Sequence, residues 1–297
     1  MPEEVLSVDL GGTHLRVALV AHDGEIRERH GVDTPKGDPR PDVLVDLVRT
    51  LGRKYSVDEA VIGLPGRVNY AAGVLEYGPH LPQQWLPLLN REALSAATGL
   101  RVHVCNDAEL AAAGEATFGA GRGFSDIIYL TISTGIGAGV VQRGLLVHGV
   151  RSMPEPGHTI VDIDEFPHGR WSMEDFASGT GMGRRAQEVG LGGTGADVLA
   201  GLTAGDARAT RIWEEALKVL RAGIFNMAMW FSPELFVLGG GIGLNAPGLT
   251  ESIGEWLAEH PPPGLPTLQV VRAALGDDAG LVGGAAWSRM FGAAGGL

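Results

Sequence analysis

Residues 130–158, LTISTGIGAGVVQRGLLVHGVRSMPEPGH, combine groups that can bind a phosphate with groups that can bind a polyol. The glycines of residues 134–139 let backbone N–H groups approach an anion without interference from a Cβ atom. At the end of the stretch, Glu155 and His158 offer a carboxylate and an imidazole, which together can hydrogen-bond hydroxyl groups. We predict a phosphate loop followed by a polar ligand-binding turn. Glycine is also used in tight turns for conformational reasons alone, so the prediction depends on the remainder of the chain.

A second glycine turn, Gly11-Gly12-Thr13, joins apolar runs at residues 5–10 and 16–20, and this pattern predicts a β-hairpin. Asp9 lies at the end of the first run, where an ionised carboxylate is costly unless a metal, water or hydrogen-bond donor meets it. A role for Asp9 at a metal and a phosphate is preferred only because of the motifs described below. The alternative is an aspartate that caps its own turn.

Asn106 and Asp107 stand where an apolar run at 102–105 gives way to a helical pattern at 108–118. Asn106 with Glu109 three residues later resembles a capping box, and on local grounds capping is the favoured interpretation. The carboxyl edge of an α/β sheet is also where such sheets bind their ligands. A binding or catalytic role for Asp107 therefore stays open at this point.

Composition limits the possible partners. The chain has 297 residues, 46 of them glycine, and a net charge of −12 from 23 basic and 35 acidic residues. The length is enough for one large or two medium domains with true cores. The acidic balance disfavours nucleic acid and anionic membranes as partners, so a phosphate has to be bound by local devices such as glycine loops, helix N-termini and a metal ion.

The compartment is predicted from the cysteine count and the N-terminus. Cys105 is the only cysteine, which rules out an intramolecular disulfide and favours the cytoplasm. The first residues are acidic where a signal peptide would be basic, and no apolar run reaches membrane-spanning length. We expect a soluble, cytoplasmic protein.

Strands and helices alternate along the chain. The predicted strands are 5–10, 16–20, 60–64, 102–105, 127–133, 235–238 and 268–272, and the predicted helices are 41–55, 91–98, 108–118, 174–186, 206–230 and 279–291. This alternation predicts an α/β protein with largely parallel inner sheets. A third glycine loop, 239–243, follows the strand at 235–238. None of the three loops is a Walker A motif, and the dinucleotide fingerprint is not met after the first strand.

The layout of strand, glycine turn and strand occurs twice, in VDLGGTHLRVALV and in LTISTGIGAGVV, and predicts two related lobes that each present a phosphate turn to a common cleft. These two motifs, together with CNDAELAAAGEATFGAG, EPGH and VLGGGIG, make the chain similar to glucokinase-like sugar kinases of the ROK family (repressors, uncharacterised frames and kinases), within the actin-like ATPase superfamily. The resemblance covers essentially the whole chain.

The resemblance implies an α/β fold of two actin-like or ribonuclease-H-like lobes, with mixed sheets flanked by helices and the active site in the interlobe cleft. It implies a small N-terminal lobe of residues 1–106, completed by a C-terminal helix at about 279–297. Residues 107–278 would form the large lobe.

Roles for single residues follow from the same resemblance. Asp107 is implied as the general base that takes a proton from the attacking sugar hydroxyl. Besides Asp107, the residues implied to bind the sugar are Gly66, His80, Asn106, Glu155, His158 and Glu174. The residues implied to bind ATP are Gly11, Gly12, Thr13, Thr134 and Gly135 at the phosphates and Gly240 and Gly241 at the adenosine, with Asp9 holding Mg²⁺ through water.

The zinc site of most of the family is not expected here. In relatives, the histidine of the EPGH-like turn also ligates a structural zinc with three cysteines, whose positions fall near Glu165, Pro167 and Ser172 in this chain. Asp162, Asp164, Glu165 and His168 could form a replacement site with His158, but a solvated acidic loop is the favoured interpretation. His158 then needs another hydrogen bond to orient its ring.

His80 is a second departure, because related kinases often have an asparagine in the corresponding GPNLP-type turn. An imidazole can still donate to a hydroxyl, so sugar binding is expected to survive while the preferred sugar shifts; an exposed histidine without a role is the alternative.

The resemblance thus implies ATP-dependent phosphorylation of a hexose, with glucose to glucose 6-phosphate as the first choice. The alternatives are fructose, mannose or an N-acetylated amino sugar as substrate, or a non-catalytic sugar sensor of the same family. The sensor is disfavoured because Asp107 is present and the first strand begins at Val5, which leaves no room for a DNA-binding segment. Relatives commonly form homo-oligomers, so a dimer or tetramer is expected.

Overall fold

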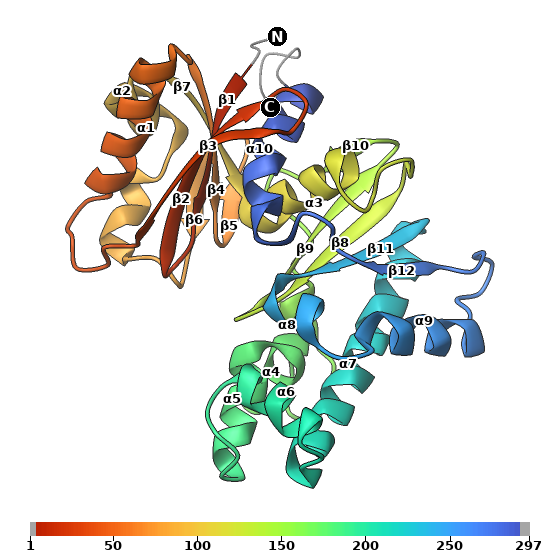
Figure 1. Ribbon diagram of the computed structural model, residues 1–297. Coiled ribbons are helices and arrows are strands. Elements are labelled where there is room, and N and C mark those ends of the chain that lie inside the picture. The colour runs from red at the N-terminus through yellow and green to blue at the C-terminus, as the bar shows by residue number, and fades with distance from the viewer. Residues whose placement is uncertain (1–3, 292–297) are drawn as a thin grey trace. The chain divides into compact units, whose positions relative to one another are not determined.

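The computed structural model describes residues 4–291, which fall into two compact units (Figure 1). Unit 1 contains the chain up to Gly123, Gly139–Met153, and the chain from Asp277 onward. Unit 2 contains Phe124–Ala138 and Pro154–Gly276. The lobe boundary between residues 106 and 107 stays a prediction.

Unit 1 is built on a mixed five-stranded sheet with the order β3-β2-β1-β4-β7. Its strands, and a separate two-stranded ribbon of β5 and β6, are β1 (Glu4–Leu10), β2 (His14–Ala21), β3 (Ile26–Asp33), β4 (Glu59–Leu64), β5 (Arg67–Asn69), β6 (Val74–Tyr77) and β7 (Arg101–Asn106). β1, β2 and β3 pair antiparallel, whereas β1, β4 and β7 pair parallel. The parallel half reads as apolar because both of its faces are covered: every residue of β4 is buried.

Helices cover both faces of this sheet. Its helices are α1 (Asp42–Tyr55), η1 (Gln83–Leu88), α2 (Arg91–Thr98), α3 (Asp107–Phe118), η3 (Gly276–Asp278) and α10 (Ala279–Phe291). Figure 1 shows α1 and α2 on one side of the sheet and α3 and α10 on the other. The helices α3 and α10 pack closely, because Gly283 brings its backbone against the carbonyl oxygen of Leu110, where a Cβ atom would stand 2.0 Å away.

Unit 2 contains the parallel strands β8 (Ile127–Ile132), β11 (Leu235–Gly239) and β12 (Gln269–Arg272). They belong to a second mixed sheet with the order β10-β9-β8-β11-β12, whose antiparallel members are β9 (Ile136–Gln142) and β10 (Leu145–Val147). The helices of unit 2 are η2 (Pro156–His158), α4 (Met173–Ala177), α5 (Gly179–Glu188), α6 (Gly195–Thr203), α7 (Ala207–Phe231), α8 (Gly240–Asn245) and α9 (Leu249–Glu259).

The predicted strands and most predicted helices are confirmed to within two residues at their ends. Three expectations are wrong. The helix at 174–186 is two helices, since Ser178 ends α4 and its side chain caps α5 through the N–H of Gly181. The glycine loop at 239–243 is instead the start of α8. The glycine turn at 134–139 is confined to Ser133, Thr134 and Gly135, because β9 already begins at Ile136.

Strands β3, β5, β6 and β10 and helices α6 and α9 were not anticipated. Side chains in β3 are charged and exposed, which hides the strand from an apolar pattern, although its cross-strand pairing with β2 is regular. None of the helices within residues 4–291 combines the length and the apolar character needed to span a bilayer.

We expect Gly283→Ala to destabilise the protein by about 1–3 kcal/mol, because the new methyl group overlaps a backbone carbonyl that cannot move aside. Gly280→Ala is the matched control in the same helix, since its Cβ would meet only the Asp9 carboxyl carbon at 3.9 Å. The control should be neutral or stabilise by up to about 1 kcal/mol. Urea unfolding measures both, and an equal midpoint for the two variants would contradict the close packing of α3 on α10.

Candidate active site

In unit 1, three parallel strands end at one edge of the sheet and deliver the predicted residues there. Asp9 on β1 pairs with Gly63 on β4, and Leu64 on β4 pairs with Asn106 on β7. Gly11–Thr13 and Gly66 lie in the turns that follow β1 and β4, and Asp107 follows β7 directly as the first residue of α3. Because carboxyl ends of parallel strands form the ligand-binding edge of α/β sheets, this edge is the candidate site of unit 1.

The turn after β1 is held by Thr34, the residue that follows β3. Thr34 donates from Oγ1 to the carbonyl oxygen of Gly11 over 2.7 Å, and its N–H donates to the carbonyl oxygen of Thr13 over 2.8 Å. A Cβ atom on Gly12 would stand 2.8 Å from the carbonyl oxygen of His80. The glycine therefore lets the predicted phosphate turn lie directly against the turn that carries His80, whose side chain is exposed.

Asp9 faces a cation across the hairpin, since the register makes Arg16 its cross-strand partner. Arg16 Nη1 lies 3.5 Å from Asp9 Oδ2 and also donates to the carbonyl oxygen of Asp277 over 3.3 Å. Burial raises the pKa of Asp9, and the nearby Arg16 charge opposes that rise only in part. Asp9 is the kind of single carboxylate, half-buried at a sheet edge, that a hydrated Mg²⁺ can use, since this ion needs only one or two protein carboxylates.

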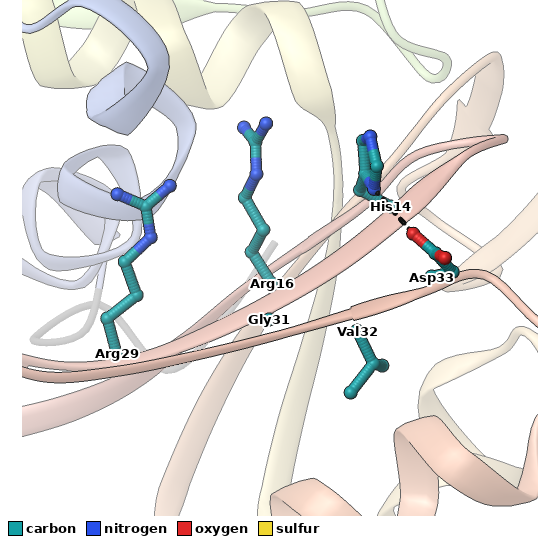
Figure 2. A pocket seen from close by; sticks show the side chains of 6 residues that line it. All are labelled: His14, Arg16, Arg29, Gly31, Val32 and Asp33. Carbon is teal, nitrogen blue, oxygen red and sulfur yellow. Dashed lines mark hydrogen bonds and ion pairs between the residues drawn. The ribbon is translucent and has the colours of Figure 1, made fainter.

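Beside Asp9, a shallow cavity of about 420 Å³ lies on the β2–β3 hairpin. Figure 2 shows His14, Arg16 and Arg29 extending to the same side of the two strands, while Val32 points to the other side. Gly31 is the cross-strand partner of Arg16 and leaves the space open. The cations are partly compensated, because Arg29 lies 2.7 Å from Asp278 and His14 3.1 Å from Asp33.

Asn106 is the N-cap of α3 and is almost completely buried. Its Oδ1 accepts the N–H of Glu109 over 3.0 Å, and its Nδ2 donates to the carbonyl oxygen of Gly66 over 2.9 Å. Asp107 is the first residue of the helix, is half-buried, and accepts the N–H of Ala108 at Oδ1 over 2.8 Å. Capping by Asn106 is confirmed, but the second half of a capping box is absent, because the N–H of Asn106 donates to Tyr70 and not to Glu109.

Gly66 has to be glycine. Its φ of +119° is costly for other residues, and a Cβ atom would stand 2.0 Å from the carbonyl oxygen of Tyr77. The turn after β4 is thereby fixed against the β6 ribbon, and its carbonyl oxygen is aimed at Asn106. The structure thus brings Gly66, Asn106 and Asp107 together.

In unit 2, the turn between β8 and β9 packs against Glu174 of α4. Oε2 of Glu174 accepts the N–H of Ile136 over 2.9 Å, and a Cβ atom on Gly135 would stand 2.7 Å from the same oxygen. The carbonyl oxygen of Thr134 accepts the N–H of Thr180 in the first turn of α5 over 3.2 Å. The predicted phosphate turn is therefore fixed by a carboxylate and by the start of a helix.

The EPGH turn lies on this glycine turn. Its residues 156–158 form one 3₁₀ turn, in which the N–H of His158 donates to the carbonyl oxygen of Glu155 over 3.2 Å. Gly157 allows the contact, since a Cβ atom there would stand 2.5 Å from the carbonyl oxygen of Ile136 and 3.1 Å from Glu174 Oε2. Glu174, Gly135 and the EPGH turn thus form one cluster in unit 2.

The ring of His158 is exposed, and within the described residues its side chain makes no hydrogen bond or ion pair. The acidic loop folds on itself instead: Asp162 Oδ1 accepts the N–H of Asp164 over 3.1 Å and that of Glu165 over 3.4 Å. Residues 4–291 contain no group of three or more His, Cys, Asp or Glu side chains that could hold a metal ion. The expected partner for the His158 ring among these acids is not observed.

Gly240 and Gly241 open helix α8 directly after β11, beside the end of the parallel strand β8. The φ of Gly240 is +76°, and a Cβ atom would stand 2.6 Å from the carbonyl oxygen of Ile132. Gly241 is exposed with open space around its Cα. A helix N-terminus without side chains at its first two positions can approach a ligand closely.

The prediction overlooked Arg16, Tyr70 and Glu109. Arg16 was recognisable, because the length of the glycine turn fixes the register and places an arginine opposite an aspartate. Tyr70 carries no such signal, since VNYAAG reads as an ordinary turn. Glu109 was assigned only to a capping box, and its side chain has a different partner, Tyr70.

Comparison with known proteins gives consistent results. A sequence model of the ROK family matches residues 5–290. The bifunctional enzyme NanE/NanK of Brucella melitensis biotype 1 is 35% identical over 94% of this chain and 52% of that protein, so the chain spans about half the length of this relative. The glucokinase of Thermotoga maritima is 31% identical over 96% of this chain and 97% of that protein.

Among solved structures, the ROK hexokinase from Thermus thermophilus superposes with a TM-score of 0.83 at 30% identity, covering 96% of this chain and 97% of that one. This likeness confirms the predicted α/β fold, in which two mixed sheets of the actin-like type are flanked by helices.

We expect Glu174→Ala to free the buried N–H of Ile136 from its acceptor and to destabilise the protein by about 1–3 kcal/mol. Hydrogen exchange of the peptide 130–140 should accelerate in this variant, and less so in Glu174→Gln, whose amide oxygen still accepts. Glu188→Ala is the control, because it removes only an exposed pair with Arg170, worth at most about 1 kcal/mol. Equal exchange in all three variants would refute the role of Glu174 in holding the turn.

Proposed function

The chain belongs to the ROK family, and we propose that it is a sugar kinase that transfers the γ-phosphoryl group of ATP to a hexose, with glucose as the substrate. The observation that carries this proposal is the sheet edge of unit 1. There, Asp107 at the start of α3 shares one edge with the glycine turn of Gly11–Thr13. Phosphoryl transfer needs a positioned base and neutralised charge more than covalent chemistry, and such an edge supplies both.

Asp107 is the proposed general base. Its carboxylate accepts the proton of the attacking sugar hydroxyl, while the hydroxyl oxygen forms a bond to the γ-phosphorus and the bond to the ADP oxygen breaks. Asn106 is proposed to hold the neighbouring hydroxyl. After its bonds to Glu109 and Gly66, its amide still has one N–H and one lone pair for the sugar.

Gly11, Gly12 and Thr13 are proposed to bind phosphate oxygens through backbone N–H groups. Asp9, which lies near the end of β1 beside this turn, is proposed to hold Mg²⁺ through water. When bound, Mg²⁺ neutralises phosphate charge during the transfer. Arg16 is proposed to balance Asp9 and to keep that carboxylate aligned across the hairpin.

The unit 2 cluster is proposed to bind the rest of the substrates. Glu155, His158 and Glu174 would bind sugar hydroxyls; Glu174 has Oε1 available, because Oε2 already accepts from Ile136. Thr134, Gly135, Gly240 and Gly241 would face the nucleotide. His80 is proposed to contact the sugar from its exposed turn. We further infer a cytoplasmic enzyme that assembles as a dimer or tetramer, as its relatives commonly do.

A sugar panel tests this function. Glucose, fructose, mannose and an N-acetylated amino sugar are each supplied with ATP and Mg²⁺, and ADP release is measured. We expect the highest kcat/KM with glucose. A higher kcat/KM with another sugar would show that glucose is the wrong substrate, while the assignment as a sugar kinase would stand. Sugar binding by calorimetry without ADP release would favour the non-catalytic sensor.

We expect Asp107→Asn to lower kcat by about 10²- to 10⁴-fold, because the amide cannot accept the proton. Calorimetric affinity for the sugar should stay close to that of the wild type, since Asn keeps the size of Asp and one acceptor oxygen. Asp58→Asn, an exposed position in the same unit, is the control and should leave kcat unchanged. A variant at position 107 with full turnover would show that another group is the base.

A further inference from the structure

A buried ring of hydrogen bonds closes around Asn106 in unit 1. The N–H of Asn106 donates to the hydroxyl oxygen of Tyr70 over 3.2 Å, and this hydroxyl donates to Oε2 of Glu109. The N–H of Glu109 then donates back to Oδ1 of Asn106 over 3.0 Å. The ring therefore consists of two residues of the strand–helix junction and one tyrosine from a distant turn.

The ring differs from an ordinary capping box by one inserted hydroxyl. In a capping box, the acidic side chain at the third helical position accepts directly from the N–H of the N-cap residue. In this chain Asn106 is the N-cap and Glu109 the third helical residue, but Tyr70 stands between them. Tyr70 thus connects the start of α3 to the segment after the β5 strand.

The surroundings fix the tyrosine and the glutamate independently. Tyr70 is 5% exposed; its N–H donates to the carbonyl oxygen of Val150 over 2.9 Å, and its ring lies 4.8 Å from that of His148. Glu109 is completely buried, and its Oε1 accepts the N–H of Met153 over 2.7 Å. Neither side chain can reach substrate from such an enclosed position.

Burial, followed by the charge of Glu109, raises the pKa of Tyr70 well above its usual value. The hydroxyl therefore remains protonated at any pH at which the enzyme works, and it always has a proton to donate to Glu109. A group that stays protonated cannot act as a general base, so any influence of Tyr70 on a reaction has to pass through the residues it holds.

We propose that Tyr70 and Glu109 form a positioning pair that fixes the backbone of Asn106 and thereby the direction in which Asp107 leaves the first turn of α3. The inference rests on the proposed function, in which Asp107 is the base. Asn106 is held at its N–H, its Oδ1 and its Nδ2. Removing the hydrogen bond from the Asn106 N–H to Tyr70 leaves a buried N–H without its acceptor. The junction of β7 and α3 can then rotate about the two hydrogen bonds made by the Asn106 side chain.

The test uses Tyr70→Phe, Glu109→Gln and the double variant in the full-length protein. Tyr70→Phe removes the hydroxyl and keeps the ring, and we expect kcat to fall by about 10- to 100-fold through misalignment of the base. KM for ATP should not change, because the pair does not touch the phosphate turn. Glu109→Gln keeps one acceptor oxygen, and its kcat should fall less than that of Tyr70→Phe.

The double variant tests whether the two residues act as one unit. If they do, its kcat should be close to that of Tyr70→Phe alone, because the ring is already broken in the single variant. It should also unfold at higher urea than Tyr70→Phe, since Gln removes the buried charge that has lost its hydroxyl donor. If the fold losses in kcat of the two single variants multiply in the double variant, the two residues act separately and the proposed pair is wrong.

Two matched controls separate positioning from simple stability. Glu115→Gln makes the same change at another completely buried glutamate of α3, which accepts the N–H of Ala120 beyond the far end of the helix. Tyr55→Phe makes the same change on a half-buried tyrosine of α1. Both controls should have the kcat of the wild type. This should hold for Glu115→Gln even if that variant unfolds at a lower urea concentration.

Amide hydrogen exchange tests the positioning pair without relying on the proposed chemistry. Exchange of the peptide 105–110 should be faster in Tyr70→Phe than in the wild type or in Glu115→Gln. Unchanged exchange, or faster exchange with unchanged kcat, would overturn the positioning pair. A wild type that turns over no sugar would overturn the proposed function instead, and the exchange result would still decide whether the pair holds the junction.

Discussion

The parallel pairing of β1, β4 and β7 is the constraint on which the site of unit 1 depends. It sets Asp9 beside Gly63 and Leu64 beside Asn106, so that three chain segments distant in sequence end at one edge. Gly63 makes this convergence possible, because a Cβ atom there would stand 3.2 Å from the carbonyl oxygen of Val8 and 3.6 Å from the Cα of Asp107. A side chain there would press on the Leu110 side chain and on the Val8 carbonyl oxygen, close to both carboxylates of the proposed chemistry.

Charge is managed locally, since the chain as a whole is acidic with a net charge of −12. A field of this sign repels nucleotides at a distance, and attraction has to arise within a few ångströms of the phosphate turns. The main proposed phosphate ligands are therefore backbone N–H groups, which donate hydrogen bonds at short range whatever the net charge of the chain. Arg16 serves a narrower purpose, because its geometry ties it to Asp9 and to the carbonyl oxygen of Asp277.

The sequence predicted those features whose cause is local. Apolar runs identified β1, β4 and β7, and glycine turns identified positions of close approach, such as Gly12 against the backbone of His80 and Gly135 against the carboxylate of Glu174. The break at Ser178 was missed, because a serine inside a helical pattern looks like an ordinary polar position. The contact of Tyr70 with Glu109 joins residues 39 positions apart and depends on tertiary structure, so no local pattern could reveal it.

The two clusters of proposed site residues differ in how firmly their side chains are held. Asn106 is bound at three atoms and buried, whereas the ring of His158 is exposed and has no hydrogen-bond partner within the described residues. A base has to be aligned before the proton moves, because a misaligned base lowers kcat. A side chain that only selects hydroxyl groups can be ordered by the sugar itself, at an entropic cost that appears in KM. On the proposed function, the junction of β7 and α3 would therefore determine the rate, and the EPGH turn would contribute to the choice of sugar.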